Sequence, residues 1–107
     1  MHVKLGPGLL ERIYEVCFCH VLSKKEIRFS SQEKVPIVYD DIKFEEAFRI
    51  DVLVEDKVIC ELKAVNDHNP VFDAQILSHL NLAKKYIGLL INFNVPLIKN
   101  GIKRFII

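Results

Sequence analysis

The clearest structural pattern in the chain lies in residues 49–65, RIDVLVEDKVICELKAV. Apolar and β-branched residues flank a short polar stretch at residues 55–57 on both sides, which is typical of two strands joined by a tight turn. We therefore expect one strand over residues 43–54 and a second over residues 57–65. The two strands form a hairpin around which the rest of the chain is arranged.

The two faces of this predicted hairpin differ in polarity. One face is entirely apolar and carries Ile50, Val52, Val54, Val58, Cys60 and Leu62. The other face carries Arg49, Asp51, Leu53, Ile59, Glu61 and Lys63. With the turn centred on Asp56, Asp51 lies opposite Glu61. Arg49 then lies opposite Lys63. A slip of one residue would turn the apolar set outward, so which side chains share a face matters more to this prediction than the exact register.

The remaining elements follow on either side of the hairpin. Apolar residues spaced three and four apart predict a helix over about residues 8–24 and another over about residues 70–85. We expect further strands over residues 33–39, 86–93 and 102–107, with Pro36 marking an edge or a bulge. The order α-β-β-β-α-β-β predicts an α/β fold in which helices pack on a mixed sheet. The β-α-β unit within it predicts one parallel strand pair.

Length and composition are those of a single globular domain over residues 1–107. Half of the residues are hydrophobic and 27% are charged, which excludes a disordered chain. No apolar run is long enough for a membrane span, and no secretory signal is present, so we expect no membrane partner. Three cysteines without a signal peptide indicate reduced thiols and a cytoplasmic location. The net charge of +1 requires any nucleic-acid contact to use a local basic patch.

The paired acids of the hairpin are the strongest chemical signal. Two carboxylates directly across a strand pair repel one another unless a cation compensates. Hard cations such as Mg²⁺ prefer carboxylate oxygens, and Lys63 lies two residues beyond Glu61 on the same face. Two acids, a metal and a lysine suffice to activate water against a phosphodiester. Glu11, at the edge of the apolar stripe of the first helix, is a candidate third acid.

Each of these residues also has a plainer interpretation. The charged hairpin face can be a solvated surface, and Glu11 can be an exposed acid in a first helical turn. Leu53 and Ile59 argue for partial cover of that face, which we expect the first helix to provide. Gln75 and His79 are four residues apart and share a helix face, where they can hold a phosphate, a water or a carboxylate, or simply form the helix surface. Tyr14 is most simply a core residue.

The stretch Gly8-Leu9-Leu10-Glu11-Arg12-Ile13-Tyr14 resembles the motif of the GxxExxY protein family, which is assigned to the PD-(D/E)XK nuclease-like superfamily. The resemblance continues through Arg49-Ile50-Asp51, through residues 58–65 and through Gln75 to residues 89–93. Ile50 replaces the namesake proline, and His79 stands where some members carry tyrosine. The chain begins late relative to the family pattern, so we expect part of an N-terminal helical segment to be missing from the single domain.

The resemblance implies a restriction-endonuclease-like α-β-β-β-α-β core, with a central mixed sheet flanked by helices. It implies that Asp51 and Glu61 bind Mg²⁺ or Mn²⁺, that Glu11 and the Leu62 carbonyl join them, and that Lys63 is the catalytic lysine. Gln75 would support catalysis. Possible substrate contacts are Tyr14, Arg49 and His79.

Two functions remain open from the sequence. The first is a metal-dependent nuclease that cleaves phosphodiester bonds, with DNA favoured over RNA as the substrate. The second is a non-catalytic module that binds nucleic acid or a protein on a nuclease-like scaffold. The complete acid-acid-lysine set favours the enzyme. A homodimer would enlarge the surface available to DNA, and the exposed sheet edges are compatible with one.

Overall fold

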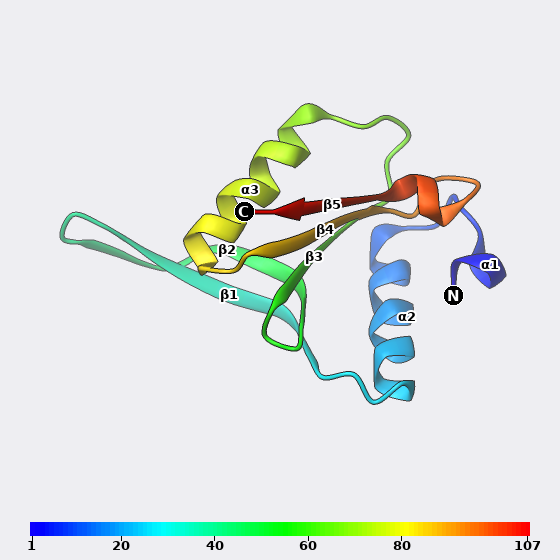
Figure 1. The fold of residues 1–107 in the computed structure, drawn as a ribbon, viewed down its shortest axis with the longest axis horizontal. Helices are drawn as coiled ribbons and strands as arrows, with labels where there is room; N and C mark the ends of the chain where they lie inside the picture. Colours follow the sequence, from blue (N-terminus) through cyan, green and yellow to red (C-terminus); the bar gives the residue numbers. More distant parts are fainter.

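The computed structural model describes all of residues 1–107 and contains one sheet with helices on both of its faces (Figure 1). The helices are α1 (His2–Leu5), α2 (Glu11–Lys24), α3 (Pro70–Ala83) and the 3₁₀ helix η1 (Ile98–Gly101). The strands are β1 (Phe29–Tyr39), β2 (Ile42–Val54), β3 (Val58–Lys63), β4 (Ile87–Asn92) and β5 (Ile102–Ile106). The predicted element order is confirmed, and α1 and η1 are additions to it.

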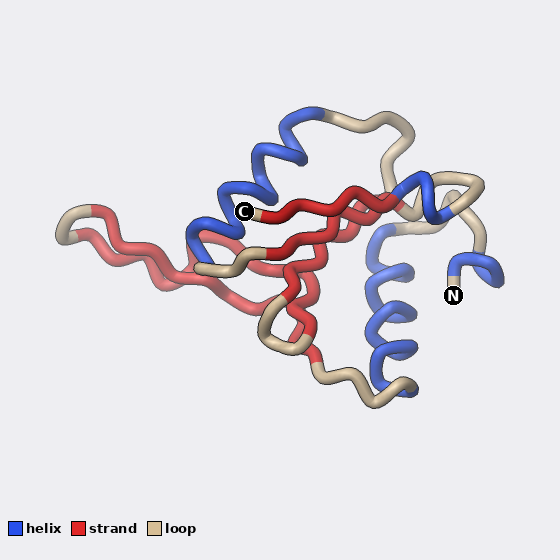
Figure 2. Tube along the Cα trace, in the orientation of Figure 1, coloured by secondary structure: helices blue, strands red, loops and turns tan.

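The five strands lie side by side in the order β1-β2-β3-β4-β5. Figure 2 shows the strands in red with helices in blue on either side of them. Only β3 and β4 are parallel, as the β-α-β unit predicts, and the other neighbours are antiparallel. Leu53 pairs with Ile59 and Val54 with Val58, which agrees with a turn centred on Asp56. The paired region of β2 and β3 ends at Val52 and Cys60. The two strands are therefore no longer paired where the predicted Asp51–Glu61 and Arg49–Lys63 pairs would lie.

Each face of the sheet has its own hydrophobic core. Helix α2 covers a cluster made of Tyr14, Leu22, Val52, Cys60, Leu62, Ile91 and Phe93. Helix α3 covers a second cluster made of Val35, Ile50, Leu53, Ile59, Ile76, Leu80 and Leu90. The cover expected over Leu53 and Ile59 therefore comes from α3, and the prediction that the first helix supplies it is wrong.

The position of Ile50 also differs from the prediction. Ile50 packs with Leu53 on the α3 side, whereas Val52 lies on the α2 side. Strict alternation is thus broken at Asp51. The neighbouring strand is irregular at the same level, because Ser31 and Glu33 pair with β2 but Gln32, with φ of 52°, does not. This local break changes the direction of the Asp51 side chain relative to an ideal strand.

Beyond the core, β1 and β2 continue as a long hairpin arm that projects from one side of the molecule (Figure 1). The register shifts between Val35 and Ile37, as the prediction of a bulge or edge at Pro36 requires. Strand β1 begins at Phe29, four residues before the predicted start. None of the helices is long and apolar enough to cross a membrane.

The start of helix α3 is fixed by local capping. Helix α3 begins at Pro70, and the Asn69 side chain accepts a hydrogen bond from the Val71 N–H at 3.0 Å. Such a cap satisfies one of the free N–H groups of the first turn, and proline suits the first helical position. These signals place the start of α3 at the predicted residue, and the helix ends in the left-handed residue Lys84.

The buried thiol of Cys60 provides a test of the α2-side core. Burial raises the pKa of Cys60 to about 12, so almost no reactive thiolate forms at pH 8. We expect Cys60 to react with a thiol reagent only on unfolding, whereas Cys17, which is partly exposed, reacts in the native protein. Timed labelling followed by peptide mass spectrometry measures this. Equal labelling rates for Cys17 and Cys60 in the native state would contradict the packing.

Candidate active site

The side chain of Asp51 lies against the backbone of β3, where β2 and β3 cease to pair. One carboxylate oxygen, Oδ2, accepts a hydrogen bond from the N–H of Leu62 at 2.9 Å. Leu62 separates Glu61 from Lys63 in the chain, so this contact holds Asp51 beside both residues. Burial raises the pKa of Asp51, and the Leu62 N–H lowers it. Smaller contributions come from nearby carboxylates, which raise this pKa, and from Lys63, which lowers it.

Glu11, in the first turn of α2, belongs to the same electrostatic cluster. Burial raises the pKa of Glu11, the charge of Asp51 raises it further, and Lys63 acts in the opposite direction. Glu11 itself is exposed at the start of α2, but its carboxylate is close enough to Asp51 and Lys63 for their charges to affect its pKa. Glu15, one turn further along α2, also raises the pKa of Asp51.

The segment before α2, which leads to Glu11, is held by Tyr14. The Tyr14 hydroxyl donates to the Gly6 carbonyl at 2.7 Å and accepts from the Leu9 N–H at 3.1 Å. Gly8 has φ of 95°, a conformation that favours glycine. Tyr14 is fully buried and stacks on Phe93 with ring centroids 4.7 Å apart. The proposed substrate contact of Tyr14 is therefore wrong, and its role is structural.

Glu61 is held by His79 on the α3 side of the sheet. The Glu61 residue is only 5% exposed, and its carboxylate is hydrogen-bonded to Nδ1 of His79. The His79 ring in turn stacks on Phe48, with ring centroids 4.1 Å apart and planes 6° from parallel. His79 thus contacts an acid of the site, which is one of the roles that its position on α3 allowed.

The ammonium group of Lys63 is available to a ligand. Its Nζ lies 4.6 Å from the centroid of the Phe72 ring, a cation–π contact. Lys63 forms none of the ion pairs found between the other lysines and carboxylates. An ammonium held by a ring retains its capacity to donate hydrogen bonds to a phosphate oxygen or a water.

Gln75 and Arg49 lie further from these groups. Gln75 is exposed on α3 and makes no hydrogen bond, so the structure does not bring it to the acids. Arg49 is half-exposed and pairs with Glu46. It lines a wide polar hollow of about 500 Å³ whose other walls include Glu11 and Glu15. Arg49 therefore borders the acidic cluster from the β2 side.

The donor set of this site matches a hard divalent cation in its chemistry. Glu11, Asp51 and Glu61 offer carboxylate oxygens, and burial has made two of these carboxylates harder to ionise. A bound cation would offset the free-energy cost of ionising carboxylates in a buried position. No three His, Cys, Asp or Glu side chains are close enough together in this structure to form a metal-binding group. Since Glu61 contacts His79, joining Asp51 at one ion requires the Glu61 side chain to turn.

Sequence reasoning overlooked three contributors to this site. Glu15 was detectable, because it follows Glu11 by four residues and hence shares its helix face. Phe48 of β2 stacks on His79, and Phe72 of α3 lies under Lys63. Aromatic residues at these positions are equally compatible with a plain core, so no local signal distinguishes them.

Removal of the His79 side chain tests its hold on Glu61. The His79→Ala variant leaves a buried carboxylate without its partner, so we expect the free energy of unfolding to fall by about 1–3 kcal/mol. Urea denaturation followed by circular dichroism measures the change. His20→Ala, at an exposed position on α2, is the matched control and should be close to wild type. Equal stabilities of the two variants would show that His79 does not hold Glu61.

The sequence was compared with protein families, curated proteins and solved structures. A family model described as the PD-(D/E)XK nuclease superfamily matches residues 1–105. No curated protein and no solved structure gave a significant match. The family match covers nearly the whole chain, and the mixed five-stranded sheet flanked by helices is consistent with a restriction-endonuclease-like fold. The chain belongs to the PD-(D/E)XK nuclease superfamily.

Proposed function

We propose that this protein is a metal-dependent nuclease that hydrolyses phosphodiester bonds in DNA. The observation that supports this most strongly is the contact of Asp51 with the backbone N–H of Leu62, which holds Asp51 next to Glu61 and Lys63. Members of the superfamily generally use divalent metals, and the oxygen donors of the site suit Mg²⁺ or Mn²⁺.

In this proposal each residue has a distinct role. Asp51 and Glu61 bind the cation, Glu11 completes the acidic side of the site, and the Leu62 carbonyl is a further oxygen donor. A divalent cation, when bound, lowers the pKa of a coordinated water and stabilises charge on the phosphate. Lys63 orients the attacking water and donates hydrogen bonds to the phosphate oxygen on which negative charge develops.

The residues around the acids position them or border the site. His79 holds Glu61 and is a positioning residue, because it acts through that carboxylate. Arg49 lines the polar hollow next to Glu11 and Glu15, and it can contact the phosphate backbone of a bound strand. We assign Gln75 only a supporting contact with substrate, since its side chain is exposed and unbonded.

The second candidate function is a non-catalytic nucleic-acid-binding module. It is favoured by one observation, namely that Glu61 is already bonded to His79 and that the acids do not form a ready metal-binding group. An assay of strand cleavage distinguishes the two functions directly, because a module that only binds nucleic acid leaves the strand uncut.

The test is incubation of labelled single-stranded DNA, duplex DNA and RNA with the protein in Mg²⁺ or Mn²⁺. We expect DNA fragments to appear with either metal and to vanish when a chelator is added. Binding without cleavage under all of these conditions would support the non-catalytic module. Cleavage that persists in excess chelator would contradict the metal-dependent mechanism.

A further inference from the structure

A cleft separate from the acidic cluster opens beyond the carboxyl ends of the parallel strands β3 and β4. Its volume is about 390 Å³, within the range of small-molecule sites. Lys63 ends β3 and Asn92 ends β4, and both line the cleft together with the start of β5. The cleft shares Lys63 with the proposed active site.

The cleft is preorganised by its own polar contacts. The Asn92 side chain accepts from the Val65 N–H at 3.1 Å and donates to the Val65 carbonyl at 3.0 Å, which joins the end of β4 to the loop after β3. The same Asn92 oxygen accepts from the Asn94 N–H at 3.1 Å. These bonds fix the wall of the cleft nearest to Lys63.

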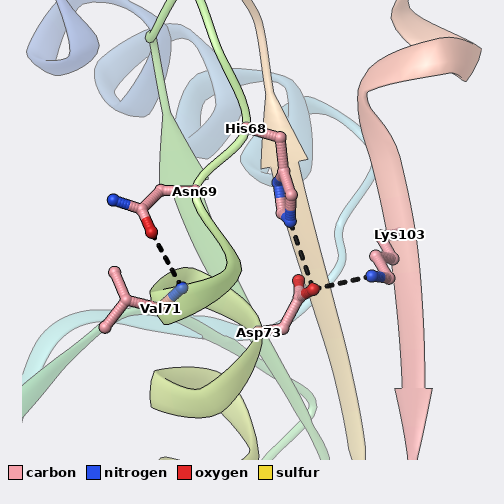
Figure 3. A network of polar contacts seen from close by, with 5 residues as sticks. All are labelled: His68, Asn69, Val71, Asp73 and Lys103. Carbon is pink, nitrogen blue, oxygen red and sulfur yellow. Dashed lines mark hydrogen bonds and ion pairs between the residues drawn. The ribbon is translucent and has the colours of Figure 1, made fainter.

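Positive charge gathers on the cleft from both sides. Oδ2 of Asp73 accepts hydrogen bonds from Lys103 at 2.8 Å and contacts Nε2 of His68 at 3.1 Å, so one carboxylate orients both residues (Figure 3). His68 and Lys103 line the cleft, whereas Asp73 does not. The Lys63 ammonium, free of any carboxylate, completes the set. The lining therefore contains no carboxylate, and of its two ammonium groups that of Lys63 has no carboxylate partner, whereas that of Lys103 is paired with Asp73 behind the lining.

The rest of the lining is apolar or uncharged. Leu90 and Ile102 contribute apolar surface, and the asparagines contribute amides. A ligand suited to this cleft has an anionic group for the lysines and a flat or apolar part for Leu90 and Ile102. A nucleotide has both. An isolated inorganic anion would leave the apolar wall without a partner.

We propose that this cleft binds the nucleotide adjoining the scissile phosphate, with its phosphate between Lys63 and Lys103 and its sugar or base against Leu90 and Ile102. This inference rests on the proposed function, because it takes Lys63 as the group that contacts the scissile phosphate. It adds a substrate site on the β4–β5 side of Lys63, which shares no lining residue with the hollow that Arg49 lines.

The test uses thymidine 5′-monophosphate, with inorganic phosphate as the comparison, in NMR titrations of the whole chain in chelator. We expect the nucleotide to shift amide signals around the cleft and to bind more tightly than phosphate. Lys103→Gln should weaken nucleotide binding about tenfold, since it removes one charged hydrogen bond. Ile102→Trp, which fills the cleft without changing charge, should also weaken it. Lys43→Gln, at an exposed lysine of the hairpin arm, should bind as wild type.

The outcomes separate this site from the catalytic proposal, because the titration contains no metal and monitors no cleavage. Nucleotide binding that both cleft variants weaken supports the site even if the protein cleaves no DNA. Unchanged binding in folded Lys103→Gln and Ile102→Trp proteins overturns it, even if the protein is an active nuclease. Phosphate binding as tight as nucleotide binding also overturns it, since the cleft would then recognise an anion alone.

Discussion

The Asp51→Asn variant is expected to cleave DNA in Mg²⁺ at least about a thousandfold more slowly than wild type. Loss of a metal-binding carboxylate removes several kcal/mol of transition-state stabilisation, and each ~1.4 kcal/mol is a factor of ten in rate. Asparagine keeps the size of the side chain, and its amide oxygen can still accept the hydrogen bond from Leu62. The substitution therefore removes charge while leaving the local geometry in place. Initial cleavage rates on a labelled oligonucleotide measure the effect.

Asp41→Asn is the matched control for this variant. Asp41 lies in the exposed turn of the β1–β2 arm, far along the hairpin from the acidic cluster, so its loss should leave the rate unchanged. Circular dichroism confirms that both variants fold. A folded Asp51→Asn protein that cleaves at the wild-type rate would remove Asp51 from the mechanism.

The Tyr14→Ala variant is expected to lose about 3–5 kcal/mol of its free energy of unfolding. Tyr14 is fully buried in the α2-side core, and truncation of a large buried aromatic leaves a cavity that the surroundings only partly fill. The change also releases the Gly6 carbonyl and the Leu9 N–H from the hydroxyl that joins them. This loss is a large fraction of the total stability of a domain of this size, about 5–15 kcal/mol.

Two further variants isolate the reasons for this effect. Tyr14→Phe keeps the ring that stacks on Phe93 and removes only the hydroxyl, so we expect a smaller loss of about 1–3 kcal/mol. Ile13→Ala, at a neighbouring position that is 41% exposed, should cost less than Tyr14→Ala. Urea denaturation gives all three values. If Tyr14→Ala were as stable as Ile13→Ala but bound DNA more weakly, Tyr14 would be a substrate contact after all.

The central hairpin could be predicted from its sequence because its signals are local. Glu55 and Asp56 both have positive φ, as a tight hairpin turn requires, and the apolar runs on either side are long enough to specify strands. Helix α3 was equally clear, since Asn69 and Pro70 form a local start signal. Where a signal lies within a few residues, the element that it predicts is present at nearly the predicted position.

The departures arise from pairing between distant segments. The residues at the start of β1, Phe29–Gln32, have too little apolar alternation to indicate a strand. They become one because they lie beside Val52–Val54 of β2. The break of alternation at Asp51 has the same origin, since Gln32, the residue expected opposite it, leaves the regular pairing. A sequence pattern within β2 alone contains no sign of this irregularity.

In the candidate site, too, the features set by local sequence were predictable and those set by the pairing of distant segments were not. The spacing of Glu61 and Lys63 placed both on one side of β3, and the structure agrees, because Glu61 reaches His79 and Lys63 reaches Phe72, both on α3. Asp51 approaches them through the backbone of Leu62 and not through a direct cross-strand pair. This arrangement depends on how β2 and β3 separate, a property of the assembled sheet that the alternation of residues does not encode.

Manganese binding, measured by electron paramagnetic resonance of the free ion, tests the central claim most directly. The titration is made with a noncleavable phosphorothioate oligonucleotide present, so that substrate oxygens are available to complete the site. We predict saturable binding to the wild-type protein, which Asp51→Asn abolishes, Glu61→Gln weakens and Asp41→Asn leaves unchanged. Absence of binding to the folded wild-type protein, or equal binding by the Asp51→Asn variant, would contradict a metal site formed by Asp51 and Glu61.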